Sequence, residues 1–506
     1  MRHGAISGGA IPNIGGNSDH SRPLEWRLPN EHVPTRQRLH ADCSPDGLGS
    51  HRLALFAAAT IATACTTTEA GTERRKKPVD PNACPATDET AITTGPTVHE
   101  GEIQGVETWA ASASPHVIKG DVNVRNGAKL VIEPCARVQF VAAASLNVAH
   151  PLTPNQGELV AEGTAERPIR FEGKDGARWN HVFVHAPGKA RFAHVTFVGG
   201  GGGDTLGHET IGAMGDGSFP RKEILFVDNV TIEGSRGAGV RMDTGAAFAP
   251  GSKALTIKGS GTDDPQHPYP IELGESAVGS VPEGTYTGNA KDEILIAPET
   301  VDAGGGFQVD TTMRSYGVPW HVGNSADKDD LSIGNGNRDA ILTIEPGVKI
   351  VFEKGAALRI ESDDDGTSAI RALGTAEKPI VFSSAAPTPA AGDWRGLYFN
   401  GPVSADNALE HVRIEYTGAD CHCSMITCSA GVSTYEAAII FAQAPKTMFL
   451  KNSTLAHGSG HGVVAGYHGV TLDWSESNTF DEIALCPVTR PVNVDTSCPE
   501  PLPACK

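Results

Sequence analysis

Apolar and polar residues alternate with a period of two through most of the chain beyond residue 104. Val348, Ile350 and Phe352 would share one side of a strand, and Val412 and Ile414 would share one side of another. The runs are roughly three to six residues long and end at Gly, Pro or Asn, which favour turns. Helical periodicity is missing from this part of the sequence, so the pattern predicts an all-β body of many short strands.

The strand pattern occurs twice in the chain, in the same order and with small loop insertions between the matching segments. The matching pairs are LVIEPCARVQF (130–140) with LTIEPGVKIVF (342–352), EGTAERPIRF (162–171) with LGTAEKPIVF (373–382), FAHVTFVGG (192–200) with LEHVRIEYTG (409–418), and NVTIEGSRGAGV (229–240) with NSTLAHGSGHGV (452–463). Trp179 and Trp394 also recur at matching positions, which favours packing over an exposed role such as stacking on a sugar. The repeat predicts two homologous tandem modules, at 104–275 and 308–485, with a connecting segment at 276–307.

Short strands without Asn-Gly hairpin turns leave two architectures, a sandwich and a solenoid. In a solenoid each strand stacks on the next coil, inward residues form ladders, and loops of variable length are tolerated at the corners. Preserved strand phrases with variable spacing are what such stacking produces. The pattern therefore favours the solenoid.

The strings LTIEPGVKIVF, GTAEKPIVF, DWRGLYF and LEHVRIEYTG closely resemble the right-handed parallel β-helix repeats of secreted and surface lipoproteins of Gram-negative bacteria. VDTTMRSYGVPWHV (309–322) also looks like a phrase of that family. The resemblance covers about 100 to 485 and implies a right-handed parallel β-helix. It implies little about function, because most of these proteins have no established activity.

The first 65 residues differ in composition from the rest, and we expect them to form a disordered leader that ends in a lipoprotein signal peptide. HRLALFAAATIATAC places a basic residue before an apolar run too short to span a bilayer. Its last four residues resemble the lipobox of bacterial lipoproteins, in which the cysteine, here Cys65, is acylated. Residues 66–103 would then be a flexible tether. The expected location is a Gram-negative cell envelope, as an outer-membrane lipoprotein or at the cell surface.

The chain carries a formal net charge of −19, with 59 Gly and only 6 % aromatic residues. Phosphates would be repelled, which argues against nucleic acid as a partner. Membrane contact is expected through the lipid anchor only. A glycan or a protein remains possible as the ligand, and we expect a monomer.

Eight cysteines follow the lipidated one, and an even number in an exported chain predicts disulfides. The eight are Cys84, Cys135, Cys421, Cys423, Cys428, Cys486, Cys498 and Cys505. The last six would attach a loop and the Pro-rich tail (486–506) to the final coil as a disulfide-rich C-terminal cap, with a connectivity that the sequence leaves open. Zinc ligation by CHCSMITC with nearby histidines is the weaker alternative.

Cys135 stands where the second module has Gly347, directly after Glu-Pro. Gly is the natural residue at such a turn, so the cysteine is the departure. Cys84 is the only other mature cysteine in the N-terminal half. We therefore predict a Cys84–Cys135 disulfide that ties the tether to module 1.

The candidate cation site is ESDDDGTS, where Asp363, Asp364 and Asp365 could donate oxygens to Ca²⁺. A solvated acidic loop explains these residues better, because module 1 has no counterpart, and we expect no cofactor.

Three functions remain open from sequence. The preferred one is a lipid-anchored surface protein whose β-helix binds, adheres or serves as structure, without evident catalytic residues. The alternatives are a polysaccharide lyase or hydrolase on the β-helix face and a metal-binding protein built on the Cys/His cluster. An enzyme would show a groove of carboxylates and basic residues shared by neighbouring coils.

Overall fold

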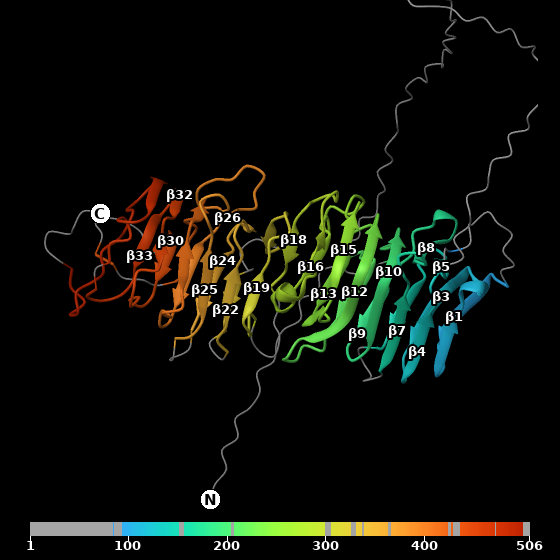
Figure 1. The fold of residues 1–506 in the computed structure, drawn as a ribbon. Coiled ribbons are helices and arrows are strands. Elements are labelled where there is room, and N and C mark those ends of the chain that lie inside the picture. Colours follow the sequence, from blue (N-terminus) through green and yellow to red (C-terminus); the bar gives the residue numbers. More distant parts are fainter. Residues whose placement is uncertain are drawn as a thin grey trace, which may run out of the picture. The chain divides into compact units, whose positions relative to one another are not determined.

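The computed structural model describes residue 84 and residues 94–150, 156–203, 207–298, 305–324, 330–335, 338–362, 366–423, 427–428, 436–470 and 472–498. In these residues the chain winds into a right-handed parallel β-helix, confirming the expected fold class (Figure 1). Each coil contributes up to three strands, and each strand pairs in parallel with its counterpart in the next coil. The described helices are three short 3-10 turns: η1 (Ala111–Ala113), η2 (Lys174–Gly176) and η3 (Glu275–Ser280).

We name the three faces of module 1 by the order in which the chain reaches them. The first face holds β2 (Val106–Trp109), β4 (Ala128–Ile132), β7 (Gly157–Glu162), the first parts of β10 (Lys189–Val198) and β12 (Lys222–Glu233), and β14 (Ala246–Phe248). The second face holds the first parts of β1 (Thr97–Glu102) and β3 (His116–Val124), then β5 (Arg137–Phe140), β8 (Ile169–Gly173), the later parts of β10 and β12, β15 (Lys253–Lys258) and β17 (Gly284–Thr285). The later parts of β1 and β3 begin the third face.

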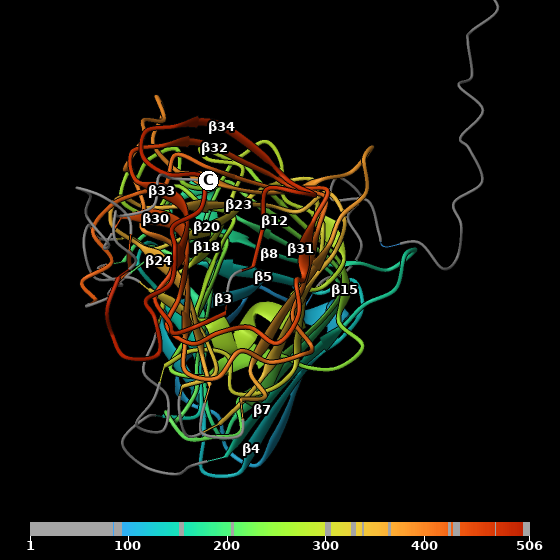
Figure 2. The same cartoon turned by 90° about the vertical axis from the view of Figure 1, so that its left-hand side faces the viewer.

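The third face runs through both modules as one ladder. It comprises β6 (Ser145–Val148), β9 (Val182–His185), β11 (Ile211–Met214), β13 (Val240–Asp243), β16 (Ile271–Leu273), β18 (Ile294–Ile296), β20 (Trp320–Val322), β23 (Lys349–Phe352), β26 (Ile380–Ser384), β29 (Val412–Glu415), β32 (Thr454–Gly458) and β34 (Thr479–Ile483). Seen end-on, the coils surround one common interior (Figure 2).

Module 2 adds two five-stranded sheets beside this ladder. One contains β19 (Thr311–Met313), β22 (Ile341–Ile344), β25 (Ala369–Leu373), β28 (Ala408–Glu410) and β31 (Leu450–Lys451). The other contains β21 (Leu331–Ile333), β24 (Ala357–Glu361), β27 (Gly396–Asn400), β30 (Ala437–Phe441) and β33 (His461–Ala465).

Single residues with left-handed backbone turn the chain from one strand to the next. His194 and Asn229 have φ of 49° and 53° and separate the two parts of β10 and β12. The matching residues of module 2, His411 and Asn452, have φ of 49° and 50° and lie between its first and second strands. His and Asn tolerate this region better than most residues. The sequence repeat is therefore also a repeat of corners.

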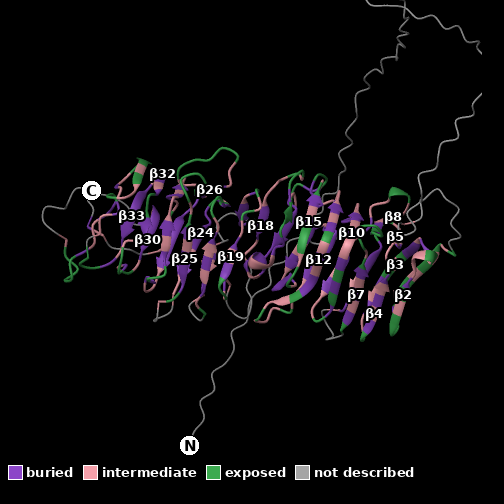
Figure 3. Cartoon of the chain, in the orientation of Figure 1, coloured by how far each residue is buried: buried purple, intermediate pink, exposed green. Residues whose placement is uncertain are grey.

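The interior is one continuous apolar core, in which alternate strand residues are buried (Figure 3). Trp179 stacks on Phe140, and Trp394 stacks on Phe352, each with ring centroids 4.2 Å apart. Both indoles are fully buried, and each donates its N–H to a backbone carbonyl. The expectation that the repeated tryptophans pack inside is confirmed.

The two modules do not stack with equivalent strands aligned. β18 is the third strand of its coil, but it pairs with β20, which is the second strand of the next complete coil. β23, the sequence counterpart of β5, therefore lies on the third face, whereas β5 lies on the second. Phe307 follows β18 in the chain and forms an isolated parallel β-bridge with Ile333 of β21. It therefore occupies the first position in the sheet that the third strands of module 2 form. Module 2 is thus rotated by one face about the axis of the β-helix.

Three segments differ from the expected boundaries. β1 begins at Thr97, inside the expected tether, because this segment pairs with β3. The connecting segment 276–307 contains most of η3 together with β17 and β18, and so adds a further coil instead of a linker. The tail bridges to the last coil through Val488 and Val492, so this part of it continues the stack.

Candidate functional site

A groove of about 930 Å³ lies on the outer side of the third face, over the second strands of module 2. It is lined by Lys291, Glu293, Lys349, Val351, Glu353, Ser383, Ser384, Ala385, Ala386, Pro387, Pro389, Glu415 and Tyr416. The lining extends from the coil of β18 to that of β29, four coil steps or on the order of 19 Å along the stack. Acidic and basic side chains from neighbouring coils therefore share one surface.

His321 of β20 lies beneath this surface with its side chain fully buried. Its neighbours Trp320 and Val322 point into the core, so strand alternation turns His321 outward. Glu293 Oε2 is 2.7 Å from its Nδ1, and Glu353 Oε1 is 3.0 Å from its Nε2. The imidazole therefore connects carboxylates that belong to the coils on either side of it.

These contacts shift the pKa of each partner. Burial lowers the pKa of His321, but hydrogen bonds to Glu293 and Glu353 outweigh it, and the pKa of His321 is raised. Burial raises the pKa of Glu293 while the bond to His321 lowers it, and the net pKa is lowered. The hydrogen bond from His321 also leads the causes that lower the pKa of Glu353. The cluster is an imidazole ring held between two carboxylates, with Lys291 Nζ 3.2 Å from its Nδ1.

Basic groups border the cluster. Lys291 Nζ is 3.1 Å from Glu293 Oε2. The same ammonium lies over the face of Tyr269, 5.2 Å from the ring centroid. Lys349 at the start of β23 is exposed and forms no ion pair with any residue that the structure describes. An ammonium without a counter-charge among the described residues is available to a ligand.

The far end of the groove is held by β26 and β29. Ser383 donates to Glu415 at 3.2 Å, and Arg413 also binds Glu415. Tyr416 stacks on His457 with the ring centroids 5.1 Å apart. Here an aromatic ring stands beside fixed polar groups, an arrangement that suits the mixed apolar and hydroxyl surface of a sugar.

The sequence did not single out His321, Glu293, Glu353 or Lys349. They are separated along the chain and become neighbours only through parallel pairing of β18, β20 and β23. One signal was present: a polar residue between Trp320 and Val322, in a strand of three residues, must face outward. It placed one residue outside but could not show which residues would surround it.

The predicted N-terminal disulfide is present, with Cys84 and Cys135 bonded and their Cα atoms 5.3 Å apart. Cys135 has φ of 74°, and Gly347 at the matching position has φ of 85°. Both residues thus occupy the left-handed turn that the comparison of the two strings predicted. Cys65, Cys505 and Asp363 to Asp365 lie outside the described residues.

At the C-terminal end, Cys421 is bonded to Cys423 and Cys428 to Cys498, and Cys486 is also disulfide-bonded. The zinc alternative for the Cys/His cluster is therefore wrong, because these sulfurs are not thiolates. The bond from Cys428 to Cys498 attaches the tail to the preceding loop, as expected of a cap. Cys421–Cys423 closes a local ring within the loop and does not reach the tail.

Within the described ranges, His, Cys, Asp and Glu form no group of three or more arranged to hold a metal ion. The same ranges contain no helix with the length and apolar character needed to cross a membrane.

A family model described as a pectate-lyase-like β-helix domain matches residues 335–408, which cover β22 to β27 and the first residue of β28. No curated protein and no solved structure gives a significant match to the chain.

Proposed function

We propose that this protein binds a polysaccharide, without cleaving it, in the groove over β20, β23, β26 and β29. The observation that carries the proposal is the exposed Lys349 beside a row of fixed polar groups that crosses several coils. An extended polymer can contact successive coils in the same way, because their spacing is regular. Lys349 favours acidic sugars, whose carboxylates would supply its counter-charge.

The ionisation of the groove favours binding over hydrolysis. A glycoside hydrolase needs one carboxyl group that keeps its proton near neutral pH, facing a second carboxylate across the glycosidic bond. Glu293 and Glu353 are both held by His321, and the pKa of each is lowered. Neither would carry a proton to donate. A lyase, which needs a base and a neutralised substrate carboxylate, is the second candidate.

We propose further that the chain is a lipid-anchored protein of a Gram-negative envelope, acylated at Cys65 and exposed at the outer membrane or cell surface. Support comes from the apolar run that ends in Ala-Thr-Ala-Cys and from the resemblance of the repeats to those of surface lipoproteins. The anchor would hold the groove near cell-surface glycans. Loss of radiolabelled fatty acid in a Cys65→Ala variant would test the acylation.

The test of the binding function is a panel of acidic and neutral polysaccharides offered to soluble residues 84–506, with binding and cleavage scored together. Lys349→Gln should weaken binding of an acidic polymer by roughly tenfold or more, as expected when a charge-assisted hydrogen bond is lost. Arg137→Gln, at the matching position of module 1, is the control and should leave binding unchanged. New chain ends or unsaturated products would show that the groove is catalytic, and no binding to any polymer would contradict the proposal.

A further inference from the structure

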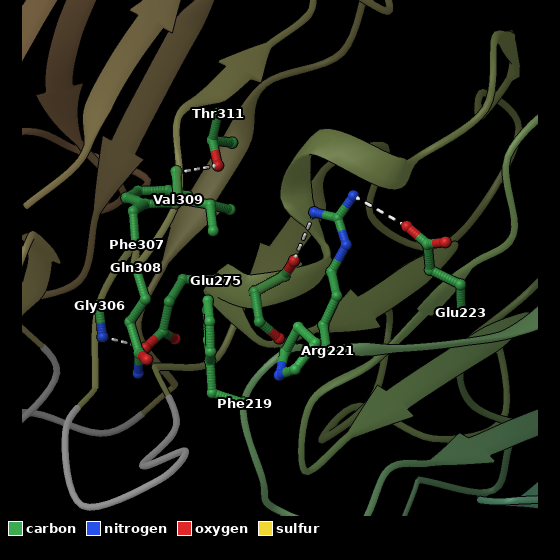
Figure 4. A pocket seen from close by; sticks show the side chains of 11 residues that line it. Phe219, Arg221, Glu223, Glu275, Gly306, Phe307, Gln308, Val309 and Thr311 are labelled. Carbon is green, nitrogen blue, oxygen red and sulfur yellow. Dashed lines mark hydrogen bonds and ion pairs between the residues drawn. The ribbon is translucent and has the colours of Figure 1, made fainter. Parts of the chain in front are cut away.

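A second hollow lies where the rotation between the modules interrupts the first face. In the next coil the short helix η3, and not a strand, lies against β14. The strand ladder therefore ends at β14 and leaves a cavity of about 370 Å³ (Figure 4). Its lining comes from η3, from 306–311 and from 219–223, which covers the corner after β11 and the start of β12. The volume falls in the range of sites that hold small molecules.

One part of the cavity wall is apolar. Phe219 and Pro220 come from the corner after β11, and Phe307 and Val309 come from the segment before β19. Phe307 is fully buried, whereas Val309 is 41 % exposed. Apolar surface at the mouth of a cavity lacks the water exclusion of the core and gains free energy when a ligand covers it.

The polar part holds one guanidinium group, Arg221, and two carboxylates, Glu223 and Glu275. Glu275 is buried and accepts the backbone N–H of Gly306, so its charge is already engaged by the protein. Arg221 Nη1 donates to the carbonyl of Ser276 at 3.1 Å, which fixes the side chain on η3 (Figure 4). Its Nη2 is 3.5 Å from Glu223, a loose ion pair with a half-exposed partner. Arginine presents a planar fork of donors, and this fork is anchored on one side and weakly engaged on the other.

A neighbouring hollow of about 390 Å³ shares Arg221 and Glu223 with the first. Arg314 lines this second hollow and donates to the carbonyl of Gly279, also on η3, at 3.1 Å. Two arginines are therefore held by carbonyl groups of the same short helix. The apolar cavity therefore opens beside two anchored arginines, which share the second hollow with Lys253, Glu223 and Glu283.

We propose that this seam pocket binds a small carboxylic acid with an apolar body. The carboxylate would receive the N–H groups of Arg221, and the apolar body would lie among Phe219, Pro220, Phe307 and Val309. This site is separate from the polysaccharide groove and does not depend on its function. Glu223 competes with the ligand for Arg221, so the site should tighten when that carboxylate is removed.

The test uses benzoate as the probe and the purified protein, with binding followed by calorimetry. Benzoate should bind, and Arg221→Gln should weaken it by about tenfold or more. Glu223→Gln should strengthen it a few-fold, since the competing charge is lost. Lys349→Gln, in the polysaccharide groove, should leave benzoate binding unchanged.

Benzylamine has a similar apolar body and the opposite charge, so it shows whether the site prefers an anion or a cation. If benzylamine binds more tightly than benzoate, and Glu223→Gln weakens it, the site selects cations and the proposal is wrong. Lack of benzoate binding to the natural protein at millimolar concentration also overturns it. Arg221→Lys keeps the charge and loses the fork, and its intermediate affinity would support bidentate recognition of a carboxylate.

Discussion

The second strands of the two modules carry the same phrases but present different surfaces to solvent. In module 1, Glu172 accepts hydrogen bonds from Arg137 at 2.7 Å, from Arg170 at 2.5 Å and from Gln139 at 3.0 Å. Burial raises the pKa of Glu172, but the hydrogen bonds from Arg137 and Arg170 outweigh it and bring the pKa to about 2. Both guanidinium groups of this cluster are bound to the same carboxylate.

At the matching positions module 2 has Lys349 for Arg137, Val381 for Arg170 and Ser383 for Glu172. The central acid is gone, so Lys349 forms no ion pair with a described residue, and the surface opens into the groove. In module 1 the basic side chains pair with an acid of the protein, whereas in module 2 Lys349 can pair with an acid of a ligand. A repeat can therefore keep the same core and corners in both copies while only one copy acquires a binding surface.

The largest effect is expected where the modules are alike. Trp179→Ala and Trp394→Ala each remove a fully buried indole stacked on a phenyl ring, and each should lower the free energy of unfolding by about 3–5 kcal/mol. Guanidinium denaturation followed by far-UV circular dichroism would measure both. A cost at one site only would show that the two cores are not equivalent.

The turn that distinguishes the modules can be converted from one form to the other. Cys135→Gly gives module 1 the residue of module 2 and removes the disulfide to Cys84, which should cost about 2–4 kcal/mol. Glycine suits φ of 74° better than cysteine, so under reducing conditions the variant should equal or exceed the reduced natural protein in stability. A less stable variant under reduction would mean that the cysteine contributes packing as well as the bond.

Two histidines, one in the middle of the β-helix and one near its N-terminal end, should give opposite pH dependences. His321 has a raised pKa, so its contribution to stability is complete below pH 6.5 and is lost as the pH rises through its folded-state pKa. Burial lowers the pKa of His99, near the N-terminus, to about 4, so stability is lost as the pH falls from 6.5 towards 4. Unfolding free energies from pH 4 to 8 should lose the first dependence in His321→Gln and the second in His99→Phe.

The smallest effect is expected from opening the closed cluster. Glu172→Ser copies module 2 and should cost about 1 kcal/mol or less at neutral pH, because the ion pairs are partly exposed. Glu172 contributes stability above pH 4.5 that disappears as the pH falls to about 2, and the variant should lack that loss. An unchanged acid transition would assign the loss to other carboxyl groups.

Much of the fold could be predicted from particular residues. Val348, Ile350 and Phe352 were predicted to share one side of a strand, and all three are buried in the core. The turn at Cys135 and its bond to Cys84 also followed from local sequence and cysteine number. The groove could not be predicted, since contacts between His321, Glu293 and Glu353 depend on which strands of different coils meet.

A solenoid of two similar modules follows from the amino-acid sequence, because strand periodicity, corner residues and inward apolar side chains are local properties of the chain. The rotation of module 2 by one face is visible only in the folded molecule. That rotation depends on how 276–307 completes its coil and on β18 pairing with β20, a backbone register that side-chain patterns do not encode. It brings the second strands of module 2 onto the third face, where the groove forms, and it interrupts the first face beside Arg221.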